Sequence, residues 1–317
     1  MKKQTCRLKI QRKGKSYQII DSPLYKLVTK KKLCKVLLLT SEELAAYIEE
    51  QDNYFEFESI GKKGKRRKIQ KPLGKLDAIH TRIASLLSRI ESPGYLHSGT
   101  KSRSNATNAF AHKGCSKILS TDIESFFHST SRRMVFSFFY SYMKCSADVA
   151  DILSRLTTCH SFIPTGSRIS MPLAFWVNIN LFDELYSLSN KHDVKMTVYV
   201  DDLTFSGESV NRLFRTCVRK IIEKHGHKMH LGKTKIYTEN QPKLVTGVVI
   251  YNDELRVRNE QHRLLATDIE QWKLIKNTPS ACAQSLTERV VGRLYAMGVI
   301  NPIFKAKALT LKSNPKT

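Results

Sequence analysis

The sequence predicts an α+β protein that combines a small antiparallel sheet with many helices. Two stretches favour strands that end in acidic residues: 117–122, and a hairpin over 198–206 with Asp201 and Asp202 at its tip. Apolar residues recur at helical spacing over 76–90, 212–224 and 260–297. The 317 residues, 41% of them hydrophobic, are sufficient for two or three sub-domains.

The composition indicates an anionic partner. The formal net charge is +25 and the sequence pI is about 9.8, which suits nucleic acid or a membrane surface. No apolar run approaches the roughly 20 residues of a spanning helix, and the basic N-terminus lacks the apolar core of a signal peptide. Seven cysteines without a C-x-x-C pair indicate reduced thiols. We therefore expect a cytoplasmic protein that binds nucleic acid and no membrane.

Three acidic residues carry the chemical prediction. Asp122 ends the apolar run of its strand, and Asp201 and Asp202 occupy the hairpin tip. Aspartates are common at turns because they bond their own backbone, so a purely structural role is one interpretation. The other is a shared site for Mg²⁺, which prefers oxygen ligands. Two such ions, roughly 3.5–4 Å apart, can hold the attacking and leaving oxygens of a phosphoryl transfer.

Several motifs resemble those of one enzyme family. Tyr199-Val-Asp-Asp202 resembles the YxDD box of reverse transcriptases, and Asp-Ile-Glu-Ser-Phe-Phe over 122–127 resembles their upstream metal-binding box. Asn-Ala-Phe-Ala-His over 108–112 matches the NAxxH box of bacterial retron reverse transcriptases, and Val-Thr-Gly over 245–247 matches their VTG box. The chain is therefore similar to that family from about residue 41 to about residue 302.

The resemblance implies a right-hand polymerase fold. Its parts would be a basic N-terminal extension at 1–40, fingers with the NAxxH loop at 41–115, a palm at 116–256 with a fingers insertion around 140–165, and a helical thumb at 257–317. The palm would hold the small antiparallel sheet. The extension has twelve Lys or Arg and one acidic residue, and it is either a solvated arm or a grip on RNA.

The resemblance also implies template-directed DNA synthesis on RNA with two Mg²⁺ ions, for which Mn²⁺ could substitute. Asp122 and Asp201 would be the principal metal ligands and catalytic residues, with Asp202 as a weaker third.

Five further residues would bind the deoxynucleoside triphosphate. Arg67, with Lys65, would clamp the triphosphate, although a basic run of this kind is also typical of a solvated loop. Phe127 would exclude a ribose 2′-OH, unless Phe126 and Phe127 are both core residues; at a strand end they would point to opposite faces. The remaining two are Gly166 and Lys233. Lys233 would protonate the leaving pyrophosphate or lie merely at the surface.

The loop that contains Gly166 departs from the family box QGxPxSP. Thr165 stands where Gln is usual, Arg168 stands where Pro is usual, and Pro172 comes one residue late. Two smaller departures are Val200 within the YxDD box and His230 at the position of the usual Asn in the box that contains Lys233. These differences affect template handling and fidelity more than the chemistry.

RNA recognition is assigned by resemblance to Asn108, His112, Val245, Thr246 and Gly247, although a capping Asn with a core His would also fit the first two. The implied partners are a cognate structured non-coding RNA, its RNA–DNA product with a 2′-5′ branch, dNTPs, and an effector protein in phage defence. The alternatives are an intron-encoded or diversity-generating reverse transcriptase, a non-catalytic RNA-binding scaffold, and a basic ribosome-associated protein.

Overall fold

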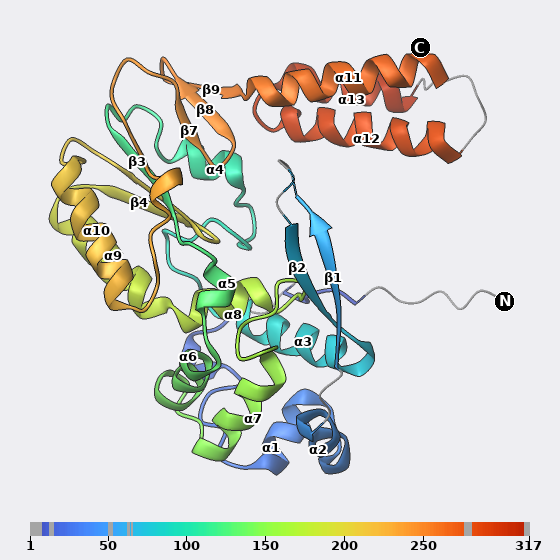
Figure 1. Ribbon diagram of the computed structural model, residues 1–317, viewed down its shortest axis with the longest axis vertical. Coiled ribbons are helices and arrows are strands. Elements are labelled where there is room, and N and C mark those ends of the chain that lie inside the picture. The colour runs from blue at the N-terminus through green and yellow to red at the C-terminus, as the bar shows by residue number, and fades with distance from the viewer. Residues whose placement is uncertain are drawn as a thin grey trace.

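The computed structural model describes residues 8–12, 16–49, 53–61, 64, 66–275 and 281–313. Within this part the chain forms an elongated body (Figure 1). Helices from the first half of the chain lie at one end, a four-stranded sheet lies in the middle, and three helices from the C-terminal part lie at the other end. The predicted α+β class with small antiparallel sheets is confirmed.

The helices and strands follow the chain in a mixed order. The strands are β1 (Tyr54–Ile60), β2 (Arg66–Pro72), β3 (Ile118–Asp122), β4 (Lys195–Tyr199), β5 (Asp202–Ser206), β6 (Lys235–Tyr237), β7 (Lys243–Val245), β8 (Val248–Tyr251) and β9 (Glu254–Val257). The α-helices are α1 (Lys30–Leu37), α2 (Ser41–Glu49), α3 (Gly74–Leu87), α4 (Asn105–Phe110), α5 (Phe126–Ser129), α6 (Arg132–Ser137), α7 (Ala147–Thr157), α8 (Ser170–Val177), α9 (Ile179–Lys191), α10 (Arg212–Lys224), α11 (Asn259–Ile275), α12 (Ala281–Gly298) and α13 (Pro302–Ser313). Shorter turns of helix are η1 (Ile19–Asp21), η2 (Phe138–Tyr142) and η3 (Leu231–Lys233).

The basic N-terminal segment is integrated into the fold. Leu24, Leu27 and Leu33 are buried in the main hydrophobic core. The capping box before α2 forms as its sequence indicates, because the amide of Glu43 donates to Thr40 Oγ1 and the amide of Thr40 donates to Glu43 Oε2, each at 3.1 Å. The lysines of α1 therefore lie on a helix whose other face is anchored by leucines.

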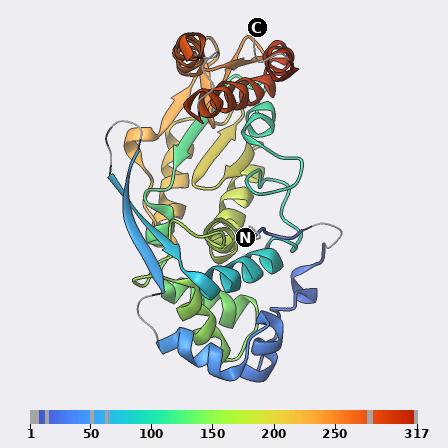
Figure 2. The same cartoon turned by 90° about the vertical axis from the view of Figure 1, so that its right-hand side faces the viewer.

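The described part of the basic run after residue 61 includes β2, the second strand of a hairpin. β1 and β2 pair antiparallel, from Tyr54 opposite Pro72 to Ile60 opposite Arg66. Figure 2 shows this hairpin along one side of the body. Lys65 falls outside the described residues, so its predicted contact with the triphosphate is not placed.

The central sheet has the strand order β4-β5-β3-β6, with every neighbouring pair antiparallel. β4 and β5 form the predicted hairpin, and β3 pairs with β5 so that Asp122 stands opposite Asp202. Helices α9 and α10 cover one face of this sheet (Figure 1). Phe205 of β5 meets Phe214 of α10 edge-on, with ring centroids 5.6 Å apart. The predicted helix over 212–224 is confirmed.

The C-terminal helices α11, α12 and α13 have a hydrophobic core of their own, which includes Leu265, Trp272, Leu286, Val290 and Leu294. The three-stranded sheet β7-β8-β9 connects them to the rest of the chain. The helical character predicted from residue 260 is confirmed, and α11 and α12 are separated by residues outside the described part. Among the described residues, no helix combines the length and the apolar character needed to cross a membrane.

Candidate active site

Three carboxylates meet where β3 and β5 end at the same edge of the central sheet. Asp122 is the last residue of β3 and Asp202 is the first residue of β5, and the two are direct register partners. The Asp201 carbonyl accepts a hydrogen bond from the amide of Ile123 at 3.0 Å. The antiparallel pairing therefore brings Asp122 beside Asp201 and Asp202, as a site shared by the three aspartates requires.

The turn between β4 and β5 is strained. Val200 has a φ of +60°, a left-handed conformation that a β-branched residue rarely adopts and that costs about 1–3 kcal/mol. The surrounding loop holds it there, because the Val200 amide donates to Ser98 Oγ at 2.9 Å. The amide of Val198 also donates to the Tyr95 carbonyl, and the amide of His97 donates to the Val198 carbonyl, each at 2.9 Å. The loop before α4 thus supports the turn that carries Asp201.

The site is electrostatically unfavourable without a cation. Asp122 is only 4% exposed. Burial and the neighbouring carboxylates Asp201 and Asp122 raise the pKa of Asp202 to about 7. Burial and the Asp122 charge likewise raise the pKa of Asp201. Like charges in a partly desolvated site disfavour ionisation, so a bound divalent cation would relieve this repulsion.

Lys233 provides a cation from the protein itself. Its Nζ lies 2.8 Å from Asp122 Oδ2. Partial burial opposes its charged form, but the hydrogen bond to Asp122 and the charges of Asp201 and Asp202 outweigh this, so the pKa of Lys233 is raised. The backbone supports this position, because the amide of His230 donates to the Asp122 carbonyl at 2.8 Å. Lys233 therefore remains protonated and faces the acidic site.

The donor set fits a hard cation such as Mg²⁺. Carboxylate oxygens are its preferred protein ligands, and water and phosphate oxygens usually complete its shell. The oxygens of the three aspartates do not all lie within 4.8 Å of one another, whereas Glu56, Cys159 and His160 meet that distance among the described residues. Glu56 is already paired with Lys68 and His160, so we interpret that second group as an ion-pair network. At the aspartates, one ion would contact all three residues only after side-chain movement.

The chain is similar over most of its length to curated proteins of one kind. It is 25% identical over 243 residues to the retron Ec86 reverse transcriptase of Escherichia coli, a match that covers 75% of this chain and 76% of that protein. It is 24% identical over 308 residues to the retron Ec48 reverse transcriptase of Escherichia coli, covering 90% and 75%. With the retron Se72 reverse transcriptase of Salmonella heidelberg the identity is 28% over 219 residues, covering 65% and 56%. No protein-family model matches the chain.

The chain is a homologue of the retron reverse transcriptases. This homology supports an enzymatic function, RNA-directed DNA polymerisation. Enzymes of this class use divalent metal ions, a nucleic-acid template and deoxynucleoside triphosphates. The resemblance inferred from the sequence motifs is thereby confirmed over most of the chain.

The boxes that distinguish retron enzymes contact each other. Asn108 Nδ2 donates to Thr246 Oγ1 at 3.3 Å, and Thr246 Oγ1 donates to the Asn105 carbonyl at 3.0 Å. Asn108 and Val245 are buried, whereas Gly247, with a φ of +82°, is exposed. The buried members of these boxes therefore join α4 to the β7–β8 turn. Their predicted role in RNA recognition stays a prediction, and in this conformation Gly247 and the half-buried Thr246 are the members that reach the surface.

His112, which ends the NAxxH box, is fully buried. Its Nδ1 lies 2.6 Å from Ser206 Oγ and its Nε2 lies 2.7 Å from Thr197 Oγ1. The ring therefore bonds to β5 and β4 at once, on the hairpin that carries Asp201 and Asp202. A side chain buried in this way ties the segment after α4 to strands β4 and β5. It exposes no atoms to which RNA could bind.

Arg67 and Gly166 lie on the hairpin side of the molecule. Arg67 is exposed on β2, opposite Ser59, and its side chain makes no hydrogen bond or ion pair with other described residues. A Cβ on Gly166 would lie 2.6 Å from the Gln70 carbonyl oxygen, so this glycine allows its loop to approach β2 closely. Their predicted contacts with the triphosphate remain predictions.

Phe127 is half-buried and Phe126 is 4% exposed. The sequence argument placed the pair at a strand end, and that placement is wrong, because β3 ends at Asp122 and both residues belong to α5. The left-handed φ of +52° at Ser125 starts this short helix. Phe126 packs on Phe182, with ring centroids 6.1 Å apart. The two aromatic residues still differ in exposure, but helical geometry rather than strand alternation separates them.

Sequence reasoning did not find two supports of the site, Ser98 and Gln70. Gln70 is 5% exposed, and its Oε1 accepts from the amide and the hydroxyl of Thr165 at 3.2 and 3.0 Å. Arg168 forms an ion pair with Asp77 of α3. The two positions that depart from the family box thus have partners on β2 and α3. An uncharged glutamine within a strongly basic run was the one sequence signal for Gln70, and nothing in the sequence distinguishes Ser98.

Proposed function

We propose that this enzyme copies part of a cognate structured non-coding RNA into single-stranded DNA, with the product joined to the RNA by a 2′-5′ branch. The support is the similarity to several retron reverse transcriptases, together with the matched NAxxH and VTG boxes. In the same proposal the enzyme works with an effector protein of its operon in phage defence. The single observation that carries the catalytic part is the meeting of Asp122, Asp201 and Asp202 beside Lys233.

The fold fits a right hand. We assign the palm to the central sheet with α9 and α10, the fingers to the β1–β2 hairpin with α3, and the thumb to α11, α12 and α13. This assignment keeps the boundaries expected at 41, 116 and 257. The insertion expected around 140–165 would correspond to η2 and α7. The extension at 1–40 shares its core with the fingers, so a grip on RNA there would come from the exposed lysines of α1.

In the proposed mechanism, Asp122 and Asp201 would hold two Mg²⁺ ions, with Asp202 as the weaker third ligand. The bound ions supply a lowered pKa for the attacking 3′-OH and neutralise charge on the leaving phosphates. The aspartates orient these charges, and the strained turn at Val200 fixes the direction of Asp201. Lys233, which stays protonated beside Asp122, is positioned to donate a proton to the departing pyrophosphate.

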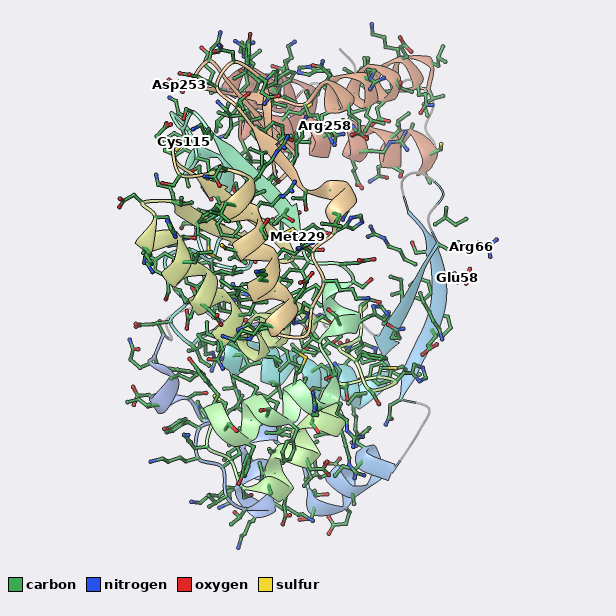
Figure 3. The ribbon with its side chains drawn as sticks, turned by 60° about the vertical axis from the view of Figure 1, so that its left-hand side comes forward. Glu58, Arg66, Cys115, Met229, Asp253 and Arg258 are labelled. Atoms are coloured by element: carbon green, nitrogen blue, oxygen red, sulfur yellow. The ribbon has the colours of Figure 1, made fainter. Side chains whose placement is uncertain are left out.

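Primer extension by a double variant tests the catalytic part. Asp201→Asn with Asp202→Asn keeps the shapes of the side chains and removes two negative charges. We expect Mg²⁺-dependent extension to be abolished and RNA binding to be retained. Asp253→Asn is the matched control, because Asp253 also lies in a β-hairpin turn and is far from Met229 beside the site (Figure 3). Unchanged extension by the double variant would rule out the mechanism.

The product requires its own test. Nucleic acid that copurifies with the wild-type enzyme, expressed with its flanking DNA, should contain a DNase-sensitive strand joined to RNA. The double variant should yield RNA alone. A DNA product with no RNA attached would favour an intron-encoded or diversity-generating type of enzyme, and RNA binding without any DNA in the wild type would favour a scaffold.

A further inference from the structure

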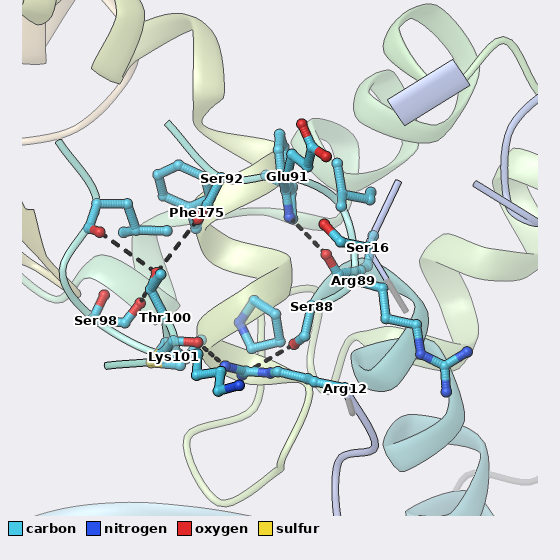
Figure 4. Close-up of a pocket in the computed structure, with 17 residues that line it drawn as sticks. Arg12, Ser16, Ser88, Arg89, Glu91, Ser92, Ser98, Thr100, Lys101 and Phe175 are labelled. Carbon is cyan, nitrogen blue, oxygen red and sulfur yellow. Dashed lines mark hydrogen bonds between the residues drawn. The ribbon is translucent and has the colours of Figure 1, made fainter. Parts of the chain in front are cut away.

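A cavity of about 290 Å³ lies between the end of α3, the loop that contains Ser98 and the start of α8 (Figure 4). One part of its wall is apolar and includes Pro172, Phe175 and Trp176. Another part presents hydroxyl groups, from Ser88, Ser92 and Thr100 among others. A volume at the lower end of the usual range for ligand pockets suits a small ligand with a polar end and an apolar end.

Arg12 gives this cavity a guanidinium that bonds, among the described residues, to neutral groups. The Arg12 guanidinium donates to the Gly99 carbonyl and, at 3.2 Å, to Ser88 Oγ, both of which are neutral acceptors. Among the described residues Arg12 has no carboxylate partner, and burial lowers the pKa of its guanidinium. Lys101 is exposed at the same cavity, whereas the Arg89 guanidinium points away from it (Figure 4). The Glu91 carboxylate is bound by Gln18.

The cavity adjoins the support of the catalytic turn. Ser98 lines it and accepts the hydrogen bond from the Val200 amide at 2.9 Å. The next residue, Gly99, has a φ of +63° and bonds to Arg12 through its carbonyl. A Cβ on Gly99 would lie 2.1 Å from the Met171 methyl group, so this loop is closely packed on the start of α8. Arg12 is therefore hydrogen-bonded to the residue that follows Ser98 in the chain.

We propose that this cavity binds a phosphate group, carried by a free nucleotide or by an RNA strand, and that its occupancy is transmitted to the catalytic turn through Ser98. A guanidinium binds phosphate oxygens with paired hydrogen bonds, and the aromatic wall suits a nucleobase. A phosphate bound to Arg12 competes with the Gly99 carbonyl for the guanidinium and changes the conformation of the 98–100 loop. The binding step stands independently of the proposed polymerase function, whereas the transmission to Val200 rests on it.

Tryptophan fluorescence tests the binding step. The chain has two tryptophans, so Trp272→Phe leaves Trp176, in the cavity wall, as the single reporter. Inorganic phosphate, GMP and a short RNA oligonucleotide are titrated in turn, without divalent metal. We expect a saturable signal, and Arg12→Gln should weaken the apparent affinity at least about tenfold, as the loss of a charge-assisted hydrogen bond predicts. Lys220→Gln, the same change of charge on the exposed face of α10, should leave the affinity unchanged.

The probes distinguish the two sources of phosphate. Saturation by GMP indicates a free nucleotide, and saturation by RNA alone indicates a strand. No saturable signal with any probe, or equal affinities in the parent and Arg12→Gln proteins, would overturn the proposal. Should Arg12→Gln fail to fold, Lys101→Gln at the exposed rim provides the same comparison, with a loss of about threefold expected for a solvated charge.

Single-nucleotide incorporation tests the transmission. Saturating the cavity with the effective probe should change kcat in the wild type more than it changes the KM for dNTP. Ser98→Ala should remove this dependence of kcat on the probe while the fluorescence affinity stays the same. If the probe binds and kcat is unaffected in the wild type, the link through Ser98 is wrong and the binding site stands. If neither the wild type nor any variant extends a primer, the proposed function is wrong, and the binding result remains valid.

Discussion

His112 provides the sharpest test of what the NAxxH box does in this enzyme. The resemblance assigns this residue to RNA recognition, whereas its ring is fully buried between Ser206 and Thr197. We predict that His112→Ala destabilises the fold and leaves the affinity of the folded protein for RNA unchanged. Two lost hydrogen bonds contribute about 1 kcal/mol each, and the void left by the ring adds about 1 kcal/mol or more. The total, about 3 kcal/mol, corresponds to a decrease in Tm of about 6 °C for a chain of this size.

Thermal unfolding and RNA binding are measured on the same preparations of wild type and His112→Ala. His192→Ala is the control, because His192 is exposed at the end of α9, where its ring meets that of Phe214 in a T-shaped contact. This substitution should change the free energy of unfolding by no more than about 0.5 kcal/mol. Retained stability with lost RNA binding would refute the structural role inferred for His112.

The pH dependence of stability gives a second measure of the same burial. Burial, with smaller effects of Lys195 and His97, lowers the pKa of His112 to about 3. The unfolded chain binds this proton below its ordinary pKa of about 6.5 and the folded protein does not. The contribution of His112 is therefore present above pH 6.5 and is lost as pH falls toward 3, by up to about 1.4 kcal/mol per pH unit. Urea unfolding between pH 7 and pH 5 should show a flatter curve for His112→Ala, and parallel curves would contradict the argument.

Three further substitutions test the site. Gly166→Ala places a Cβ 2.6 Å from the Gln70 carbonyl oxygen, so it should lower the free energy of unfolding by about 1–3 kcal/mol and raise the KM for dNTP. The control Gly94→Ala, with no atom within 4 Å of its Cβ, should change neither unfolding nor kinetics. Asp202→Asn removes a carboxyl whose pKa burial and its neighbours raise to about 7; its Tm in EDTA at pH 8 should exceed that of the wild type, and an unchanged or lower Tm would argue against repulsion. Lys233→Gln should lower kcat about 100-fold with little change in KM, and a kcat within a factor of two would leave Lys233 without a role in proton transfer.

Local chemistry made part of the fold and site predictable. Strand-forming residues around Asp201 and Asp202 predict a hairpin, and the apolar spacing over 212–224 predicts α10, because both patterns depend on residues close in the chain. Pairing β3 with β5 is a long-range event that no local pattern encodes. It could be proposed only because acidic residues at two strand ends make chemical sense together.

The error at Phe126 and Phe127 has a similar origin. The sequence argument applied strand alternation to these two residues, whereas the left-handed Ser125 precedes α5, to which both belong. That conformation is imposed by packing, since Phe126 must reach Phe182 in the core. Side-chain direction next to a chain reversal depends on such contacts, which lie far away in sequence.

The resemblance to retron reverse transcriptases, the large excess of positive charge and the choice of the three aspartates could all be read from the sequence, because composition and short motifs are local properties of the chain. Three features follow from the tertiary structure and not from the sequence. His112 and Asn108 are buried, and Ser98 accepts a hydrogen bond from the strained turn. The unusual Thr165 and Arg168 bond to Gln70 and Asp77. Each of these is a contact between segments distant in the chain, and burial, which decides whether a side chain meets RNA or the core, exists only after those segments pack.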